Sequence, residues 1–587
     1  MANIAQLLTG HMDIWTAAEA EKRSGRGRAI GSNGSIYGVK KLRELILELA
    51  VRGKLVPQDP NDEPASELIK RIQAEKAKLI AEGKLKKEKQ LAPIAEDEKP
   101  FELPQGWGWV YFGEIAQHNS GKTLDKGRNK GVLRDYITTS NLYWGMFELD
   151  NVKQMPIEES ELEKCTAQKG DLLICEGGEA GRAAVWTLDK EVCFQNHIHR
   201  ARMHGNISPF YAYRYFEKLN ASGEIEQYRK GVGISNMSGK ALASVIFALP
   251  PLAEQHRIVA KVDELMALCD QLEQQHSNAQ EAHETLVSQL LATLTQSRNA
   301  AEFNANWQRI YAHFDLLFTT EASIEALKQT LLQLAVMGKL VPQDPNDEPA
   351  SELLKRIQAE KAKQIAEGKL KKEKPLAPIA EEEKPFELPQ GWGFVRKSEV
   401  FIFLNGYAFK SQWFKQSGIK LLRNVNISHG DTNWRETAYI SSSMANDFAQ
   451  FNLNKGDLVL SLDRPIITTG LKYALISDSD LPSLLLQRVA KISSYSNSVF
   501  TRYLAIWINS EFFVGKIDPG RSNGIPHIST TEISKLVFAL PPLAEQHRIV
   551  AKVDALMALC DQLKTRLQQA GQQQQAIADA LVAQALA

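Results

Sequence analysis

The stretch ALPPLAEQHRIVAKVD stands at Ala248–Asp263 and, without one changed letter, again at Ala539–Asp554. Its paired prolines predict that a helix begins beside them, because proline is favoured at the first helical position and cannot continue a strand ladder. Glu254 then falls in the first turn, where the helix dipole favours a negative charge. The stretch is therefore the start of a helix that the chain writes twice.

Each copy of the helix carries apolar residues at alternating steps of four and three, which are the a and d positions of a coiled coil. Ten residues define this seam: Ile258, Val262, Leu265, Cys269, Leu272, Ile549, Val553, Leu556, Cys560 and Leu563. Two apolar stripes in one chain are most economically buried against each other. The pattern therefore predicts an antiparallel coiled coil of long repeated helices.

Longer repeats surround this stretch, and we call these repeated segments the joints of the chain. Phe247–Leu272 matches Phe538–Leu563 except at Glu264/Ala555, and Gly53–Val110 matches Gly338–Val395 except at five positions. The five differences are Ile69/Leu354, Leu79/Gln364, Gln90/Pro375, Asp97/Glu382 and Trp109/Phe394.

Two modules that hardly resemble each other, Tyr111–Ile246 and Arg396–Val537, lie between the repeats. A simple recent duplication would leave the modules as similar as the joints. Either a shared function keeps the sequences of the joints identical, or recombination has replaced the modules. A two-domain scaffold with similar linkers is the alternative, but packing alone leaves unexplained why exposed-looking letters such as QDPNDEP are identical in both copies.

A further pairing indicates a circular arrangement. Lys41–Arg52 resembles Ala326–Met337, and both run directly into GKLVPQ. The N-terminal segment therefore supplies one half of a joint whose other half is the C-terminal helix, with Gly25–Ser35 as a flexible linker.

We expect an α+β protein in which the antiparallel coiled coil separates two globular α/β domains in a pseudo-two-fold circular organisation. The expected parts are an N-terminal helical segment with linker (1–110), a first domain (111–246), a central helical spacer (247–395), a second domain (396–537) and a C-terminal helix (538–587).

Composition limits the class of protein further. The 587 residues exceed one ordinary domain, with 43% apolar and 24% charged residues, as is usual for a soluble protein with a real core. Basic and acidic residues balance at 70 each, which argues against a protein coated in positive charge but not against local basic patches. The five cysteines form no CxxC pair, and no apolar run is long enough to span a membrane. A cytoplasmic protein is expected.

The arrangement of these motifs resembles the specificity subunit of type I restriction–modification systems. LPPLAEQHRIV follows each module, LAVxGKLVPQ precedes it, and each module contains a GDLL-type strand, at Gly170–Val185 and Gly456–Gly470. The second copy of that strand lacks the glycines of the first, so its turn must differ. The resemblance extends over essentially the whole chain.

The resemblance implies two target recognition domains that each read one half of a split sequence in double-stranded DNA. It also implies that the repeated helices dock two methyltransferase subunits and that motor–nuclease subunits complete the complex. S-adenosylmethionine, ATP and Mg²⁺ would then bind to the partner subunits, and this chain would hold no cofactor and no metal.

Candidate DNA contacts lie in Gly-punctuated basic loops, since Arg and Lys suit phosphate contact and Arg or Asn can reach base edges. The first module offers Lys122, Lys126, Arg128, Lys130, Arg134, Asn141, Arg229 and Lys230. The second offers Lys410, Lys415, Lys420, Arg423, Asn424, Asn426, Arg521 and Asn523. Its 16 basic and 11 acidic residues also give the second module a net positive charge, whereas the first is balanced.

Some of these assignments have a structural alternative. Asn141 and Asn426 occupy matching places, where a base contact and a plain turn role are equally open, because asparagine is favoured in turns. The twice-written run GKLKKEK is more typical of a solvated face or a partner contact than of a phosphate clamp.

Two rival classes remain to be weighed. For an enzyme, SGKT at Ser120–Thr123 resembles the end of a phosphate-binding loop, but Ala116 stands where that motif needs glycine. The histidines are scattered, and His197 and His199 lack companions at metal spacing, so we expect no catalytic centre. A coiled-coil scaffold without sequence-specific DNA binding explains the helices but not two dissimilar modules with basic loops.

Overall fold

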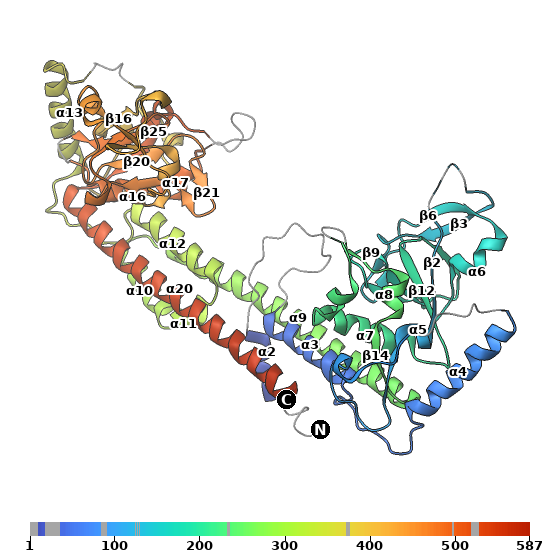
Figure 1. The fold of residues 1–587 in the computed structure, drawn as a ribbon. Helices are drawn as coiled ribbons and strands as arrows, with labels where there is room; N and C mark the ends of the chain where they lie inside the picture. The colour runs from blue at the N-terminus through green and yellow to red at the C-terminus, as the bar shows by residue number, and fades with distance from the viewer. Residues whose placement is uncertain are drawn as a thin grey trace. The chain divides into compact units, whose positions relative to one another are not determined.

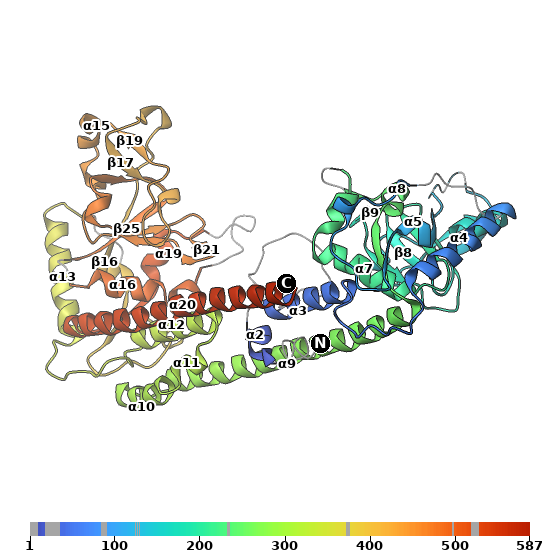
Figure 2. The same cartoon turned by 60° about the horizontal axis from the view of Figure 1, so that its bottom comes forward.

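The structure is a computed structural model that describes residues 10–17, 36–83, 91–123, 125, 127, 129–231, 235–370, 376–495, 498–517 and 527–586. The expected linker Gly25–Ser35 lies outside these residues. The chain forms two compact units: Met1–Ala279 with Gln569–Ala587, and Gln280–Gln568 (Figures 1 and 2).

The first module is built on two four-stranded sheets. One has the order β10 (Ala183–Val185), β8 (Leu172–Cys175), β12 (Ile198–Met203) and β2 (Ala116–Ser120). The other has the order β6 (Lys153–Ile157), β3 (Val132–Ile137), β11 (Val192–Phe194) and β7 (Thr166–Ala167), and only its β3–β11 pair is parallel. Ile137, Leu173 and Phe194 share one buried cluster, so the two sheets enclose a common core.

The second module repeats this plan although its sequence differs. One sheet has the order β16 (Phe401–Asn405), β25 (Val489–Ser494), β20 (Leu458–Ser461), β23 (Tyr473–Leu475) and β18 (His429–Gly430). The other has the order β19 (Ala438–Ile440), β17 (Ile419–Leu422) and β24 (Ser483–Leu485), and its β17–β24 pair is parallel. Both modules are therefore variants of one fold.

Repeated residues close each module with a two-stranded antiparallel ribbon. β1 (Gly108–Tyr111) pairs with β14 (Ile246–Leu249), and β15 (Gly393–Arg396) pairs with β26 (Val537–Leu540) in the same register. A buried helix packs beside each ribbon: α7 (Pro209–Ala221) in the first module and α16 (Thr501–Ile508) in the second.

Shorter elements complete the modules. In the first they are α5 (Phe112–Ile115), β4 (Leu142–Tyr143), β5 (Met146–Phe147), α6 (Leu162–Cys165), β9 (Gly177–Gly178), β13 (Ser235–Asn236) and α8 (Gly239–Ala243). In the second they are α14 (Lys397–Val400), α15 (Ser442–Asn446), β21 (Ile466–Ile467), β22 (Gly470–Leu471), α17 (Glu511–Val514) and α19 (Thr530–Lys535). Outside the modules lie α2 (Met12–Ala17), α4 (Ala65–Ala81), α10 (Ala300–Tyr311), α11 (Phe314–Leu317) and α13 (Ala350–Ala366).

Two 44-residue helices, α9 (Leu252–Thr295) and α20 (Leu543–Leu586), begin at the repeated prolines as expected. In the first unit the start of α9 packs against α3 (Tyr37–Val51), where Arg43 pairs with Asp270 at 2.6 Å. The end of α20 joins them, because Tyr37 donates a hydrogen bond of 2.8 Å to Asp579. The first unit therefore holds three helices that come from distant parts of the chain.

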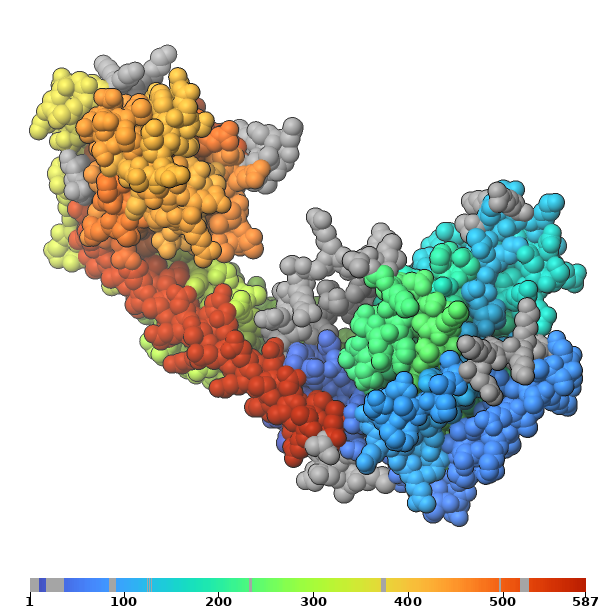
Figure 3. Space-filling view, in the orientation of Figure 1, coloured from blue at the N-terminus to red at the C-terminus, as the bar shows by residue number. Residues whose placement is uncertain are grey.

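The second unit contains the same bundle with the roles of the long helices exchanged. The start of α20 packs against α12 (Glu321–Val336), where Lys328 pairs with Asp561 at 2.5 Å. One side of α20 is open to solvent there (Figure 3). Lys339 donates to the carbonyl of Thr295 at the end of α9, just as Lys54 donates to the carbonyl of Leu586 at the end of α20. The same lysine of GKLVPQ thus caps the C-terminus of a long helix in both units.

The predicted fold class is confirmed, but the expectation that the two seams bury each other is wrong, because the seam of α9 lies in the core of the first unit and the seam of α20 in the core of the second. All ten seam residues are buried: those on α9 share a core with Leu42, Leu45 and Leu49 of α3, and those on α20 share one with α12. In the first unit the end of α20 runs alongside α3 and antiparallel to α9, since Lys54 follows α3 and reaches Leu586, whereas Gln58 reaches Glu254 at the start of α9. Each seam therefore buries its stripe in a bundle that also includes a shorter repeated helix.

Candidate nucleic-acid interface

The repeated stretch holds a buried carboxylate that ties three segments together. Glu254 is buried at the start of α9 and accepts hydrogen bonds from the side chains of Gln58 (3.0 Å) and Trp107 (2.9 Å). Burial raises the pKa of Glu254, and the two donors oppose that shift. The second repeat makes the same contacts at the same distances with Gln343, Trp392 and Glu545.

An ion pair explains part of the identity of QDPNDEP. Arg257 on α9 pairs with Asp62 at 2.6 Å, and Arg548 on α20 pairs with Asp347 at 2.6 Å. These residues look exposed from their type, yet the side chains of Asp62 and Asp347, paired with the arginines, are only 10% and 9% exposed. We call these contacts of Glu254 and Arg257, and their copies at Glu545 and Arg548, the braces. Sequence reasoning missed them, because hydrogen bonds between distant residues leave no local periodicity. The exact identity of the two copies was the only signal.

A buried glutamine at the start of each long helix connects the module to that helix through hydrogen bonds. The side chain of Gln255 accepts a hydrogen bond from the backbone of Ser208, which begins α7, and donates one to the carbonyl of Pro250. Gln546 makes the equivalent bonds with Phe500 and Pro541. Because the module contributes only a backbone N–H, this connection accepts modules of different sequence.

The predicted DNA-contacting residues of the first module fall into three groups. Lys130, Arg134 and Lys230 are exposed. Lys122 is partly buried and pairs with Glu161, and its hydrogen bond lowers the pKa of that carboxyl. Lys126 and Arg128 lie outside the described residues.

Arg229 has a structural role. Its Nε donates a hydrogen bond of 2.7 Å to the carbonyl of Ala180, and its terminal nitrogens contact Glu226 and Asn220. With little of its side chain exposed, Arg229 fixes its loop against the module and is not free to meet a ligand.

The matching asparagines have their side chains inside turns. Asn141 accepts the backbone N–H of Thr138 at 2.9 Å and donates to the carbonyl of Glu148 at 3.0 Å. Asn426, which is fully buried, accepts from the backbone of Arg423 and donates to the carbonyl of Asn433. Of the two interpretations left open, this geometry favours the turn role, and we leave both residues out of the proposed interface.

In the second module, Lys410 and Lys415 are exposed, and the Nζ of Lys410 lies 5.5 Å from the ring centre of Trp413. Lys420 donates to the carbonyl of Ser479 and lies over the ring of Trp434. Arg423 donates to the carbonyl of Glu436, and Asn424 to that of Asp463. Arg521 and Asn523 lie outside the described residues.

An exposed apolar pair lies between two of the basic candidates in the first module. Val132 and Leu133 on β3 are 66% and 62% exposed, and they lie between Lys130 and Arg134 in the chain. Apolar side chains beside basic ones suit a DNA groove, where they can contact thymine methyl groups. Sequence reasoning missed this pair, because two adjacent apolar residues in a strand normally indicate burial on at least one side.

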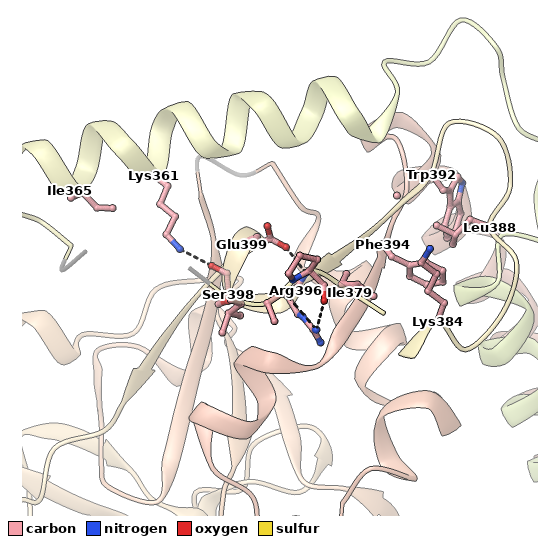
Figure 4. Close-up of a pocket in the computed structure, with 14 residues that line it drawn as sticks. Lys361, Ile365, Ile379, Lys384, Leu388, Trp392, Phe394, Arg396, Ser398 and Glu399 are labelled. Carbon is pink, nitrogen blue, oxygen red and sulfur yellow. Dashed lines mark hydrogen bonds between the residues drawn. The ribbon is translucent and has the colours of Figure 1, made fainter. Parts of the chain in front are cut away.

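A groove of about 840 Å³ lies at the edge of the second module (Figure 4). α13 forms one wall, and the strap from Leu376 to Phe394 forms the other. Lys361 reaches from α13 to the carbonyl of Ser398 at 2.9 Å, and Arg396 pairs with Glu383. The first repeat has the same residues at all but three of the lining positions, and its Lys76 makes the equivalent bond to Gly113.

Other kinds of site were sought in the described part of the chain. There, no group of three or more His, Cys, Asp or Glu side chains is arranged to hold a metal ion. His199 is buried, hydrogen-bonded to the carbonyl of Met237, and its pKa is lowered by burial. None of the described helices is long and apolar enough to cross a membrane.

Two modules of one fold, held by equivalent contacts to repeated segments, define a protein with two equivalent domains on long helices. The chain belongs to the type I restriction modification DNA specificity domain family, which matches residues 104–281 and 389–570. It is a specificity subunit that recognises a two-part DNA target, and the enzymatic activities of such a system belong to its partner subunits.

Particular relatives cover the chain from end to end. The specificity subunit of the type I restriction enzyme EcoAI from Escherichia coli is 49% identical, over 99% of both chains. That of EcoEI from Escherichia coli is 39% identical, over 99% of this chain and all of its own. The crystal structure of the HsdS subunit from Thermoanaerobacter tengcongensis has 17% identity and a TM-score of 0.43, covering 83% of this chain and 98% of that chain.

Proposed function

We propose that the first module reads one half of the target and the second module the other, and that two methyltransferase subunits dock on the repeated joints. The supporting observation is the pairing of identical braces with dissimilar modules of one fold. Motor–nuclease subunits complete the complex. S-adenosylmethionine, ATP and Mg²⁺ bind to the partners, and the complex works in the cytoplasm.

The DNA contacts proposed for the first module are Lys130, Arg134 and Lys230, with Lys126 and Arg128 from the same loops. In the second module they are Lys410 and Lys415, with Arg521 and Asn523. The described members are exposed and have long cationic side chains, as phosphate contact requires. Lys122, Lys420, Arg423 and Asn424 have partners within the protein, and their proposed role is to support these loops.

The groove of Figure 4 is the proposed docking site for the methyltransferase. Its lining combines apolar side chains such as Ile379 and Trp392 with the cations Lys361 and Lys384, as a partner's amphipathic segment would require. The first repeat presents nearly the same residues, and two equivalent surfaces bind the same partner twice.

Native mass spectrometry of the complex checks this stoichiometry. We expect two methyltransferase subunits per chain at saturation, because both repeats present the groove residues. Ile379→Glu places a charge among the apolar groups of one groove and should reduce the count to one, as should Ile94→Glu in the other repeat. The double variant should bind none. Lys516→Glu, an exposed change outside the groove, is the control.

A saturated one-to-one complex of the unsubstituted chain would contradict two-fold docking. Two subunits retained by the double variant would instead move the docking site away from the groove.

The basic loops give a second prediction, which concerns salt dependence. Replacing Lys130 or Lys230 by Ala should weaken binding to all DNA sequences alike, since phosphates carry no sequence information. Each replacement should lower the slope of log affinity against log salt by about one. Lys169→Ala is the matched control, because Lys169 is exposed but pairs with Asp189. Gel-shift titrations at several salt concentrations measure the slope, and unchanged slopes for both variants would move the phosphate contacts elsewhere.

A further inference from the structure

The loop after β20 in the second module brings together side chains from distant parts of the chain, and Asp463 lies at its centre. The carbonyl of Asp463 accepts hydrogen bonds from Asn424 (2.6 Å) and Ser461 (2.7 Å), and its carboxylate pairs with Arg488 at 3.0 Å. Its backbone also forms a bridge with His527. Segments that are far apart in the sequence therefore meet at one place.

Two arginines at this place have a backbone conformation that L-residues rarely adopt. Arg464 has φ of 48° and Arg488 has φ of 67°, and Asn206 is the only other non-glycine residue with positive φ in the described part of the chain. When the segment GDLLICEGG of the first module is aligned with GDLVLSLDR of the second, Gly178 corresponds to Arg464. Gly178 also has a positive φ, of 80°. The first module meets the same backbone requirement with glycine, at no steric cost.

The left-handed conformation disfavours an arginine relative to glycine, because the Cβ atom lies too close to the following carbonyl oxygen. The contacts of these side chains do not offset that cost. Arg464 is exposed, and the side chain of Arg488 is 67% exposed, so its ion pair with Asp463 contributes little to stability. Strain of this kind, kept for an exposed side chain, points to a role in binding.

The charge of the loop also suits a nucleic acid. Lys472 contacts Asn424, and its pKa is lowered by burial and by the nearby charge of Arg464. Three cationic side chains, those of Arg464, Lys472 and Arg488, therefore lie near the carboxylate of Asp463. The corresponding loop of the first module carries Glu176 and Glu179, and Glu179 is held by Trp144 at 2.7 Å and paired with Arg182 at 3.2 Å. Arg182 matches Lys472 in the strand registers, whereas the position of Arg464 has a glycine, so the second module has an additional arginine at this place.

We propose that Arg464 and Arg488 are specificity-determining residues that read guanines in the half of the target recognised by the second module. Arginine is suited to this contact because its guanidinium can donate two hydrogen bonds to O6 and N7 of guanine in the major groove. Asp463 orients Arg488, and the left-handed backbone directs Arg464 outward from the loop. The inference rests on the proposed assignment of one half-site to each module.

The test uses the complete chain with its methyltransferase partner, on DNA duplexes randomised in one half-site at a time. Arg464→Gly places the residue of the first module on the same backbone, so the variant should fold at least as well as the original chain. It should lose discrimination by about 10- to 100-fold at one guanine position of the second half-site. Arg488→Gln should do the same at another position. Discrimination in the first half-site should not change.

Arg435→Gln is the control, because Arg435 is an exposed arginine of the same module outside this loop. A uniform loss of affinity for all sequences would show phosphate contact and overturn base reading. Unchanged discrimination in both variants would also overturn it. If the unsubstituted complex shows no preference in the second half-site, the proposed function fails as well, and this outcome separates the two.

Discussion

Exchanging Tyr111–Ile246 for the corresponding stretch of a relative should change one half of the recognised sequence and leave the other half as it was. The module is joined to the repeats by a closing ribbon and by a hydrogen bond from the backbone N–H of Ser208 to the side chain of Gln255, neither of which depends on the side chains of the module. A mismatched base pair costs about 1–3 kcal/mol, so a half-site with several changed bases should lose essentially all binding.

Mapping methylated adenines across a genome that carries the exchanged system measures this outcome. The donor should retain an arginine at the position of Arg214, because Arg214 pairs with Asp263 of α9 as Arg502 pairs with Asp554 of α20. The matched control exchanges Arg396–Val537 and should change only the other half. A single exchange that altered both halves would show that the modules do not read independently.

The long helices could be predicted because their period is strong and their starts are marked by proline. The apolar steps from Ile258 to Leu272 identify both the helix and its buried side. The sequence could not show that α3 and α12 share each seam equally with the long helices, since their apolar stripes fit several partners. That arrangement depends on polar contacts such as Arg43–Asp270 and Lys328–Asp561, which have no sequence period.

The candidate DNA contacts remain predictions, and the structure shows only which of their side chains are exposed and which have partners within the protein. Residue type and loop position suggested Arg229 and Asn426, but these side chains are used inside their own loops. A basic or amide side chain in a turn can face either way, and only the fold decides. The sequence did not single out Arg464, because its positive φ is a property of the backbone that residue type alone does not reveal.

Lys397 shows how the second module departs from the first at a buried position. It begins α14 and is 1% exposed, and the first module has Phe112 at the equivalent place, packed against Phe216 and Phe247. The Nζ of Lys397 lies 4.1 Å from the ring centres of both Trp507 and Phe513, without a hydrogen-bond acceptor among the described residues. An amine therefore stands where an aromatic ring would fit.

Burial lowers the pKa of Lys397 well below its ordinary value. The two rings favour the charged form by on the order of 1–2 kcal/mol each. The desolvation of a buried ammonium without a carboxylate costs several kcal/mol, so it outweighs the rings. Between the folded pKa and the ordinary value of about 10.4, the unfolded chain binds more protons than the folded chain. Stability should therefore rise with pH across that window and be lowest below the folded pKa.

Lys397→Phe should thus stabilise the chain by roughly 1–3 kcal/mol at neutral pH, because it replaces an unsatisfied buried amine with the residue of the first module. The gain should shrink as the pH rises toward about 10.4, because the lysine of the unfolded chain loses its proton there and is uncharged in both states only above that pH. Urea denaturation of the full chain at pH 7 and at pH 9.5 measures both effects. Lys397→Met serves as a second variant if the ring overfills the space, and Lys516→Met, at an exposed lysine, should change stability by less than about 0.5 kcal/mol. The opposite result is that both Lys397 variants are no more stable than the original chain and keep its pH dependence. The amine would then be charged and well solvated in the folded protein, and the inferred effect of burial on Lys397 would be wrong.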